Sequence, residues 1–548
     1  MILIDRITSN ENIELAIDKL KKNKGSKTPG VDGICLKDIL EDKAKIIMRA
    51  QKTLRSNNYK PLPVRRIEIP KENGKTRPLG IPTIFDRIIQ QSIKQVIEPL
   101  IDKKFYPNSF GFRPKRSAEH AMALNCNLIN RAGLHFVVDV DIKSFFDNIN
   151  HKKLIKQLIK IGIKDKKIIS IIKAMLKTEV VLPNGEIVKP EKGTPQGGIL
   201  SPLLANVVLN ELDWWIDSQW FGKRLDREYK KQKYKKCALK RCGLTEVRII
   251  RYADDFKLLC RTREGADKIF KLVKIFLKER LKLEVSKEKS KIINLKKKSS
   301  NFLGFRIKAI KRRNTWTART FIGDKAKKNI LLKIRAQIKI LAKIPTTIEA
   351  MKFNSIIRGI QNYYRIATMV NIDLNKIGYI ISKILYIRFG KGSNKKDIMY
   401  RMRFPNYNYK VWNIDNITLF TLEALIFKIP KHYSDKNYKS RVDELKESIE
   451  EKLYVDEYKS NPKWEILRAE VRFKSNSKCA VTGDYISGNN RYDVHHVIPK
   501  QNGGQDVIEN LVLLKPEIHR LLHSNKAHEF YKENKMYQKL LKSLSEKK

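Results

Sequence analysis

Two stretches of the chain alternate apolar and polar residues with the two-residue period of a β-strand. Residues 136–147 read FVVDVDIKSFFD, so that valine and isoleucine share one face while Asp139 and Asp141 share the other. Residues 249–259 read IIRYADDFKLL, where β-branched and aromatic residues on both arms predict a hairpin with a two-residue turn. The pattern therefore predicts an acidic strand and, farther along the chain, a hairpin that presents two adjacent carboxylates at its tip.

Other segments predict further strands and helices. A hairpin is expected where residues 64–70 and 76–82 flank a glycine-containing turn. Helices are expected around residues 13–20, after residue 202 and over residues 334–341, because apolar residues there recur at three- and four-residue intervals. This mixture of elements over 548 residues predicts an α+β multidomain chain of three or four domains.

The acidic residues of the strand and the hairpin indicate a metal site. Two neighbouring aspartates repel each other unless cations lie between them, and an acidic strand beside the hairpin would complete the ligand set of a two-metal phosphoryl-transfer site. The alternative is a solvated Asp-Asp turn. Asp139 has a second interpretation as a structural hydrogen-bond partner, and Asp147 has one as the N-cap of a helix that begins near His151.

The motifs DIKSFFD and YADD, in this order, resemble the catalytic core of a reverse transcriptase, specifically that of group II intron-encoded proteins. The resemblance implies a right-hand polymerase with fingers and palm. It implies that Asp141, Asp254 and Asp255 are catalytic and bind two Mg²⁺ ions. It also implies that Phe146 packs under the incoming sugar and disfavours a 2′-hydroxyl.

Three further motifs resemble the nucleotide- and template-binding segments of the same family. In KTRPLGIPT, Lys75 and Arg77 are expected to hold the triphosphate, because their cationic groups match phosphate oxygens. In SFGFRP, Arg113 is expected to contact a phosphate. In GTPQGG, Gln196 and Gly197 are expected to position the template base and the incoming nucleotide. The simpler interpretations are a solvated basic hairpin, an aromatic core segment and a tight turn.

The chain after residue 306 changes character. A basic amphipathic helix over residues 334–341 is interpreted as a thumb helix on duplex phosphates, with a helix on a membrane surface as the alternative. The motif IRG–NYY that follows resembles the maturase, or X, domain of the family. This resemblance implies that Arg358, Tyr363 and Tyr364 bind intron RNA, whereas the plainer interpretation packs the tyrosines in a core.

Histidines gather near the C-terminal end in the order typical of an HNH nuclease. His519 and His523 are four residues apart and share one helical face, as paired metal ligands must. The resemblance implies that His495, His519 and His523 bind one divalent metal (Mg²⁺, Mn²⁺ or Zn²⁺), that His496 is the general base, and that Asn510 orients it or joins the metal shell. The alternative is a basic helical tail with chance histidines.

The cysteines argue against a structural zinc. Many relatives surround the HNH motif with two CxxC pairs, whereas this chain has six cysteines without any such pair, and Thr482 stands where a partner of Cys479 would lie. We therefore expect no structural Cys₄ zinc. The expected regions are fingers and palm at 1–306, an α-helical thumb and maturase domain at 307–400, a DNA-binding region at 401–474, and a ββα-metal HNH domain with a basic tail at 475–548.

The charge of the chain favours nucleic acid as its partner. A formal charge of +56 destabilises a compact chain by self-repulsion unless a polyanion neutralises it, although an AT-rich genome also inflates lysine. The resemblance implies a multifunctional protein: an RNA-directed DNA polymerase, a splicing maturase and an HNH endonuclease that nicks target DNA for target-primed reverse transcription.

The expected partners are intron RNA in a ribonucleoprotein, target double-stranded DNA and dNTPs, and a homodimer is left open. No membrane is expected. Because the cysteines are scattered and unpaired, we expect a protein of the bacterial cytoplasm. When bound to DNA, it would associate with the nucleoid. The alternative is an organelle-encoded protein. The alternative functions are a splicing maturase with a silent polymerase, a non-intron reverse transcriptase and a stand-alone homing nuclease.

Overall fold

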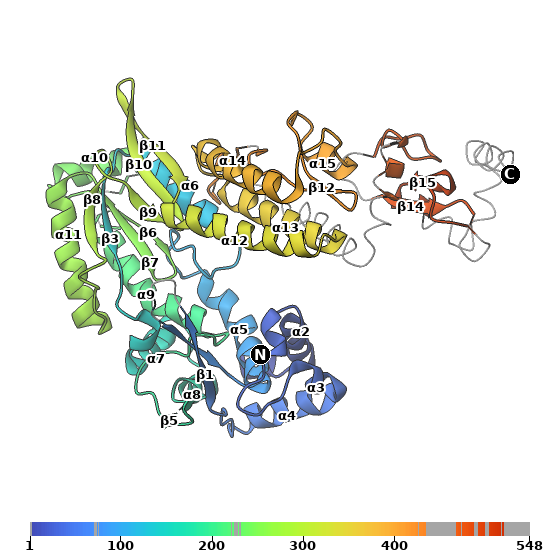
Figure 1. Ribbon diagram of the computed structural model, residues 1–548. Coiled ribbons are helices and arrows are strands. Elements are labelled where there is room, and N and C mark those ends of the chain that lie inside the picture. Colours follow the sequence, from blue (N-terminus) through green and yellow to red (C-terminus); the bar gives the residue numbers. More distant parts are fainter. Residues whose placement is uncertain are drawn as a thin grey trace. The chain divides into compact units, whose positions relative to one another are not determined.

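The computed structural model divides into two compact units, which are described separately (Figure 1). The first comprises Met1–Arg319 and Pro430–Tyr433, and the second comprises Thr320–Ile429 and Ser434–Lys548. The described residues are 3–70, 74, 76–220, 222–223, 228–229, 232–425, 427–434, 467–468, 470–472, 474–486, 492–498, 504–516 and 518–519. Lys75, His523 and residues 435–466 of the expected DNA-binding region lie outside them.

Short helices begin the first unit. They are α1 (Leu3–Ile7), α2 (Asn10–Lys21), η1 (Lys24–Lys27), α3 (Leu36–Glu41) and α4 (Lys43–Arg55), followed later by the longer α5 (Ile84–Asp102). The helix expected near residues 13–20 is confirmed as α2, whose Ile13, Ile17 and Leu20 are buried. Because α5 packs against α1 and α2, this apolar stripe closes a core.

The predicted basic hairpin belongs to a four-stranded sheet in the order β2-β1-β4-β5. Its strands are β1 (Val64–Pro70), β2 (Thr76–Ile81), β4 (Val180–Val181) and β5 (Ile187–Val188). Strands β1 and β2 pair antiparallel, as expected, and β4 runs parallel to β1. The sheet thus joins the hairpin to a segment about a hundred residues farther along the chain.

The acidic strand and the YADD hairpin lie in a second sheet, in the order β6-β7-β3-β8, with every neighbouring pair antiparallel. Its strands are β3 (Phe136–Val140), β6 (Val247–Tyr252), β7 (Asp255–Cys260) and β8 (Lys291–Asn294). Helices α6 (Ala118–Asn130) and α9 (Ser201–Ser218) contact β6, and α11 (Arg263–Ile275) contacts all four strands. Both predicted strand elements are therefore confirmed.

The remaining elements between these strands are helical. They are η2 (Phe145–Asn148), α7 (His151–Ile161), α8 (Lys166–Leu176), α10 (Gln232–Arg241) and a π-helix, η3 (Phe276–Leu281). The expectation that Asp147 caps the helix near His151 is wrong. The N-cap of α7 is Asn150, whose side chain accepts a 2.9 Å hydrogen bond from the backbone of Lys153, because a cap must directly precede the first helical turn.

A three-stranded sheet, ordered β11-β10-β9, precedes the helices of the second unit. Its strands are β9 (Ser300–Phe302), β10 (Phe305–Arg312) and β11 (Thr315–Ile322). The helices are α12 (Asp324–Lys343), α13 (Thr347–Tyr364), α14 (Val370–Phe389) and α15 (Ile398–Arg403), and a short hairpin, β12 (Asn413–Ile414) and β13 (Ile417–Thr418), follows them. The expected stripe is confirmed, since Ile334, Ile338 and Leu341 of α12 are buried.

Residues 430–433 return to the first unit after the chain has formed these helices. The guanidinium carbon of Arg116 lies 3.1 Å from the ring centroid of Tyr433, and the ring centroids of Phe110 and His432 are 5.9 Å apart. The backbone N–H of Lys431 donates to Glu119 at 3.2 Å. The first unit therefore contains two chain segments that are far apart in sequence.

A small core lies near the C-terminal end of the described chain. Strands β14 (Asp493–His496) and β15 (Leu511–Leu514) pair antiparallel, with η5 (Ile508–Asn510) just before β15. Val471, Cys479 and Leu513 are among the residues buried between these segments. Among the described helices, none is long and apolar enough to cross a membrane.

Candidate active sites

The three predicted catalytic aspartates lie at neighbouring strand ends of the second sheet. Asp254 belongs to the β6–β7 turn and Asp255 begins β7, opposite Tyr252. Val140 pairs with Phe256, so Asp141, the residue after β3, follows the same edge as Asp255. The backbone N–H of Asp141 donates to Ser290 Oγ at 3.0 Å, which fastens this strand end to a loop far downstream.

The electrostatics of this edge favour a cation. Desolvation is the largest cause that raises the pKa of Asp255 to about 6, and the charges of Asp139, Asp254 and Asp141 raise it further, against the opposing charge of Lys257. The side chain of Asp255 nevertheless reaches the surface, which leaves it accessible to an ion. The donor set, carboxylate oxygens only, is the type that Mg²⁺ prefers.

Two observations indicate that Asp141, Asp254 and Asp255 fit a metal ion: their negative charges, and their position at one edge of the sheet. In the part of the chain that the structure describes, no three His, Cys, Asp or Glu side chains already converge on one point. The contacts of Asp139 favour the structural role: its carboxylate lies 2.5 Å from Lys257 Nζ and accepts a hydrogen bond from Ser300 Oγ at 3.0 Å. Asp139 therefore neutralises a buried lysine beside the three aspartates.

Two of the predicted nucleotide-binding residues, Arg77 and Gln196, are linked to Asp147 of η2. Arg77 Nε donates to Gln196 Oε1 at 3.0 Å, and Gln196 Nε2 donates to Asp147 Oδ1 at 3.4 Å. Gly197 adopts φ 118°, and a Cβ there would clash with the carbonyl oxygen of Gly80, so the loop needs glycine at this point. Phe146 is partly buried against the core of the first unit.

Arg113 is placed differently from these residues. Its side chain is buried, with Nε 2.6 Å from Asp102 Oδ1, and its guanidinium donates to the backbone carbonyls of Tyr106 and Ser109 at 2.8 and 2.9 Å. These contacts favour a structural role in the loop after α5. Phosphate contact by Arg113 stays a prediction that this geometry does not favour.

The tyrosines of IRG–NYY lie at the end of α13. Tyr363 is 44% exposed, and together with Lys333 and Gly359 it lines a cavity of about 490 Å³. Tyr364 lines the same cavity, and burial raises its pKa. The cavity is open at Gly359, where an added Cβ would meet no atom within 4 Å. This half-open face can admit a planar or flexible ligand.

The HNH histidines are held by carboxylates. His496 Nε2 lies 2.7 Å from Asp506 Oδ1, and His519 Nδ1 lies 3.2 Å from Asp493 Oδ2. Because a carboxylate only accepts, these contacts put the hydrogen on those nitrogens and the lone pair on His496 Nδ1 and His519 Nε2. Such an arrangement suits one histidine as a base and the other as a metal ligand.

Two other residues complete the described part of the site. The ring centroids of His495 and His519 are 5.4 Å apart, so the two predicted ligands adjoin each other across β14 and the segment that follows β15. Asn510 is buried, its Oδ1 accepts from the backbone of Ile498 at 2.8 Å, and its Nδ2 donates back to the Ile498 carbonyl at 3.1 Å. This favours orientation of the loop over metal ligation.

Family models match both sites. Residues 69–307 match the reverse transcriptase (RNA-dependent DNA polymerase) family, and residues 478–525 match the HNH endonuclease family. The chain is 32% identical over 466 residues to "Group II intron-encoded protein LtrA" of Lactococcus lactis subsp. cremoris, which covers 70% of this chain and 76% of that protein. The chain belongs to the family of group II intron-encoded proteins.

Two further relatives match smaller parts of this group II intron-encoded protein. "Protein YkfC" of Escherichia coli (strain K12) is 33% identical over 302 residues, 53% of this chain and 78% of that protein. "Nuclear intron maturase 2, mitochondrial" of Arabidopsis thaliana is 31% identical over 178 residues, about a quarter of each chain. The predicted mixed helix-and-strand, multidomain fold is confirmed, and so are reverse transcriptase and HNH endonuclease domains in one multifunctional enzyme.

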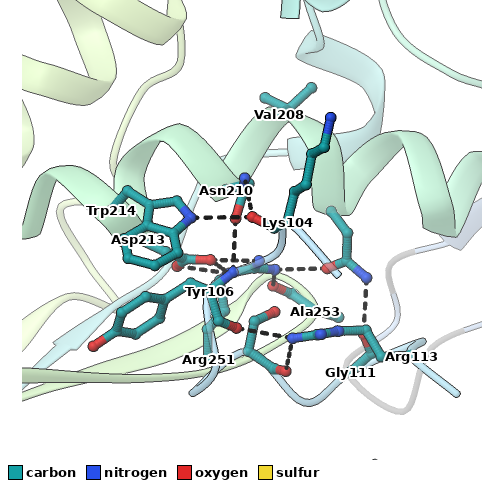
Figure 2. Close-up of polar contacts among 12 residues, drawn as sticks. Lys104, Tyr106, Gly111, Arg113, Val208, Asn210, Asp213, Trp214, Arg251 and Ala253 are labelled. Carbon is teal, nitrogen blue, oxygen red and sulfur yellow. Dashed lines mark hydrogen bonds and ion pairs between the residues drawn. The ribbon is translucent and has the colours of Figure 1, made fainter. Parts of the chain in front are cut away.

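A polar network beside the candidate polymerase site of this group II intron-encoded protein was not predicted from the sequence (Figure 2). Arg251 of β6 is fully buried and lies 2.6 Å from Asp213 of α9. Asn206, seven residues before Asp213 on the same face of α9, accepts from Arg251 at 2.7 Å. The available signal was polar residues at buried positions of an apolar helix and one arginine in an apolar strand.

Proposed function

We propose that this protein copies RNA into DNA at the shared edge of β3 and the β6–β7 turn, with two Mg²⁺ ions held by Asp141, Asp254 and Asp255. The observation that carries the proposal is the gathering of these carboxylates at one sheet edge, where desolvation and mutual repulsion raise the pKa of Asp255. When bound, the ions activate the primer 3′-hydroxyl and stabilise the leaving oxygen.

The neighbouring residues bind and orient the nucleotide in this proposal. The exposed guanidinium of Arg77, oriented by Gln196, binds the triphosphate together with Lys75. Gly197 lets the GTPQGG backbone approach the base pair, and Phe146 lies under the incoming sugar. Residues 1–306 then act as fingers and palm, and residues 307–400 act as the thumb and maturase domain.

The second part of the proposal concerns RNA. The cavity beside α13, which is lined by exposed Tyr363, by Tyr364 and by Lys333, supports contact between intron RNA and these tyrosines, and Arg358 on the same helix is assigned to the same contact. A protein with a formal charge of +56 binds phosphate backbones strongly at low salt. We therefore assign it the role of a splicing maturase that stays bound to its intron as a ribonucleoprotein.

The third part concerns DNA. His496 acts as the base and His495, His519 and His523 hold one divalent metal, in a ββα-metal domain spanning residues 475–548. The carboxylate–histidine pairs support this division of roles. The nick in double-stranded target DNA, which the region 401–474 helps to bind, supplies the 3′-hydroxyl that primes reverse transcription. The bacterial cytoplasm, on the nucleoid, is the compartment we assign to these steps.

Primer extension on an RNA template with Mg²⁺ and dNTPs tests the proposal. The wild type should extend the primer, and Asp254→Asn/Asp255→Asn should not, while both bind the template equally. A matched control is Asp267→Asn, an exposed carboxylate on α11 paired with Arg263. A wild type that binds RNA but never extends the primer would instead identify a maturase with a silent polymerase.

A further inference from the structure

A second cavity of the second unit is lined by aromatic and cationic side chains. It has a volume of about 650 Å³, and its lining includes Tyr379, Lys383 and Tyr386 of α14 and Lys410 and Trp412 from the segment after α15. The α14 residues follow one another at intervals of three and four, so they share one face of the helix.

Backbone and side-chain hydrogen bonds hold together the wall of this cavity that carries Lys391, Lys410 and Trp412. Ser393 and Val411 exchange backbone hydrogen bonds of 2.8 and 2.9 Å, which ties together the two segments that carry Lys391 and Lys410. Trp412 Nε1 donates to the carbonyl of Gly390 at 3.0 Å, so the indole ring is held in one orientation. A fixed wall lowers the entropy cost of binding a flat ligand.

The opposite wall, which is formed by α14, exposes large aromatic and aliphatic side chains to solvent. Tyr379 is 63% exposed, Tyr386 is 54% exposed and the adjacent Ile387 is 76% exposed. The lining contains three lysines and no carboxylate, and Lys383 Nζ lies 4.6 Å from the ring centroid of Tyr379. Apolar faces surrounded by cations match a ligand with flat apolar rings on an anionic backbone.

We propose that this aromatic–lysine cavity binds an unpaired nucleobase of single-stranded RNA, which stacks on the tyrosines while Lys383, Lys391 and Lys410 contact the flanking phosphates. The proposal rests on the RNA-binding role proposed above and adds a site separate from the IRG–NYY motif. The charge complementarity favours RNA over a second protein or a second copy of this chain.

Binding of the full-length protein to unstructured oligouridine RNA over a series of salt concentrations tests this site. Tyr379→Leu/Tyr386→Leu keeps apolar bulk but removes the rings, and it should weaken binding by about ten-fold without changing the salt slope. Lys383→Gln/Lys391→Gln/Lys410→Gln should reduce the slope of log affinity against log salt by roughly 0.7 per lysine. Tyr409→Leu is the matched control, since Tyr409 is 75% exposed but outside the lining.

The outcomes separate the two proposals. Equal RNA affinity for the tyrosine pair and the Tyr409→Leu control would overturn the cavity as a base-binding site and leave the maturase role standing. A wild type that binds no RNA would overturn both. A change of oligomeric state in the tyrosine variant, with RNA affinity unchanged, would overturn the site in favour of a protein interface.

A separate observation concerns the turn that carries the catalytic aspartates. Ala253, the residue before Asp254, has φ 58°, a left-handed conformation that residues other than glycine rarely adopt. Arg251 Nη1 donates to the carbonyl of Ala253 at 3.0 Å (Figure 2). The same guanidinium donates to both carboxylate oxygens of Asp213, so its direction is fixed by helix α9.

The turn is also held from its other side. Asn206, which accepts from Arg251, donates through Nδ2 to the carbonyl of Gly111 at 2.9 Å. The backbone of Gly111 lies so close to Ala253 that a Cβ at position 111 would clash with the Ala253 nitrogen. The guanidinium therefore links α9, the SFGFRP segment and the catalytic turn in one buried network.

We infer that Arg251 is a positioning residue for the polymerase reaction, which holds the Ala253 carbonyl and thereby directs Asp254 and Asp255 toward the metal ions. Single-nucleotide addition by Arg251→Lys tests this role, because lysine keeps the buried charge but lacks the fork that reaches Asp213, Asn206 and Ala253 together. We expect kcat to fall by about a hundred-fold, with the KM for dNTP unchanged and a higher Mg²⁺ concentration needed for half-maximal rate.

A purely structural arginine would give a different result. If the activity of Arg251→Lys falls only in proportion to the folded fraction, with an unchanged Mg²⁺ dependence, the positioning role is overturned. Arg261→Lys is the matched control, since Arg261 pairs with Glu246 at 2.8 Å just beyond the far end of β7. Asn206→Ala provides a second variant with the guanidinium intact, and it should shift the Mg²⁺ dependence in the same direction.

Discussion

The proposed polymerase site and the proposed nuclease site both lie at strand ends, but they are supported in different ways. The turn before Asp254 is held by a guanidinium that no solvent reaches, whose side-chain partners come from α9, and Asn206 of that helix also donates to the carbonyl of Gly111. His496 and His519 are held by Asp506 and Asp493, carboxylates that are each 39% exposed and at most 26 residues away in sequence. One site therefore depends on fully buried contacts between distant segments, and the other depends on partly exposed contacts between residues nearer in sequence.

The two chemistries should be separable. His496→Ala should reduce DNA nicking by about 10³-fold or more while primer extension is unchanged, and Asp254→Asn/Asp255→Asn should do the reverse. The reason is that each change removes a group that acts in only one reaction. Assays of nicking and extension on one preparation check this, and loss of both activities in either variant would mean that the sites are coupled.

Gly111→Ala should disturb the polymerase from outside its motifs. The new Cβ would clash with the Ala253 backbone and displace the turn. A misplacement of catalytic groups by about 1 Å can reduce the rate of primer extension by about 10²-fold. Gly25→Ala is the control, since a Cβ there meets no atom within 4 Å. Extension assays give the answer, and a fully active Gly111→Ala protein would show that the turn tolerates movement.

Asp506→Asn should affect only the nuclease. The substitution removes the charge that favours the proton on His496 Nε2, and loss of such a supporting carboxylate typically costs about 10- to 100-fold in activity. Nicking rates of the variant and the wild type, measured on the same double-stranded DNA, should show this lower rate. An unchanged nicking rate would argue that Asp506 does not support the base.

The pH dependence of the polymerase follows from Asp255. Its pKa is raised to about 6, so the carboxylate is ionised above that pH and protonated below it, where protons compete with metal. The Mg²⁺ concentration for half-maximal extension should therefore rise as pH falls below 6, by about ten-fold per unit for one competing proton. A flat Mg²⁺ requirement between pH 5 and pH 7 would contradict this.

Removal of the metal from the HNH region should have the smallest of these effects, because an apolar core stabilises this region. Cys479 is buried in the small core with Val481 and Leu513, and burial raises the pKa of its thiol while hydrogen bonds from Thr482 and nearby backbone groups lower it more. We expect a chelator to abolish nicking with almost no change in the thermal midpoint of the HNH region. Cooperative unfolding on chelation would reveal a structural metal.

Local patterns in the sequence were sufficient for the acidic strand, the YADD hairpin and the amphipathic helices, because alternation and helical spacing depend on neighbouring residues. They did not identify the partner of Arg251, since Asp213 is 38 residues away and meets it only after α9 packs on β6. The ion pair of Arg113 with Asp102 was missed for the same reason, because it forms only in the folded loop, and phosphate contact by Arg113 stays a prediction. Buried polar pairs are set by tertiary packing, which periodicity does not report.

The return of residues 430–433 to the first unit has a consequence for synthesis of the chain. On the ribosome, the segment that packs on Phe110 and Arg116 emerges only after all of residues 320–429. At about 5–20 residues per second, that interval is on the order of ten seconds. During that interval, the surface around Phe110 and Arg116 lacks the cover that residues 430–433 later provide.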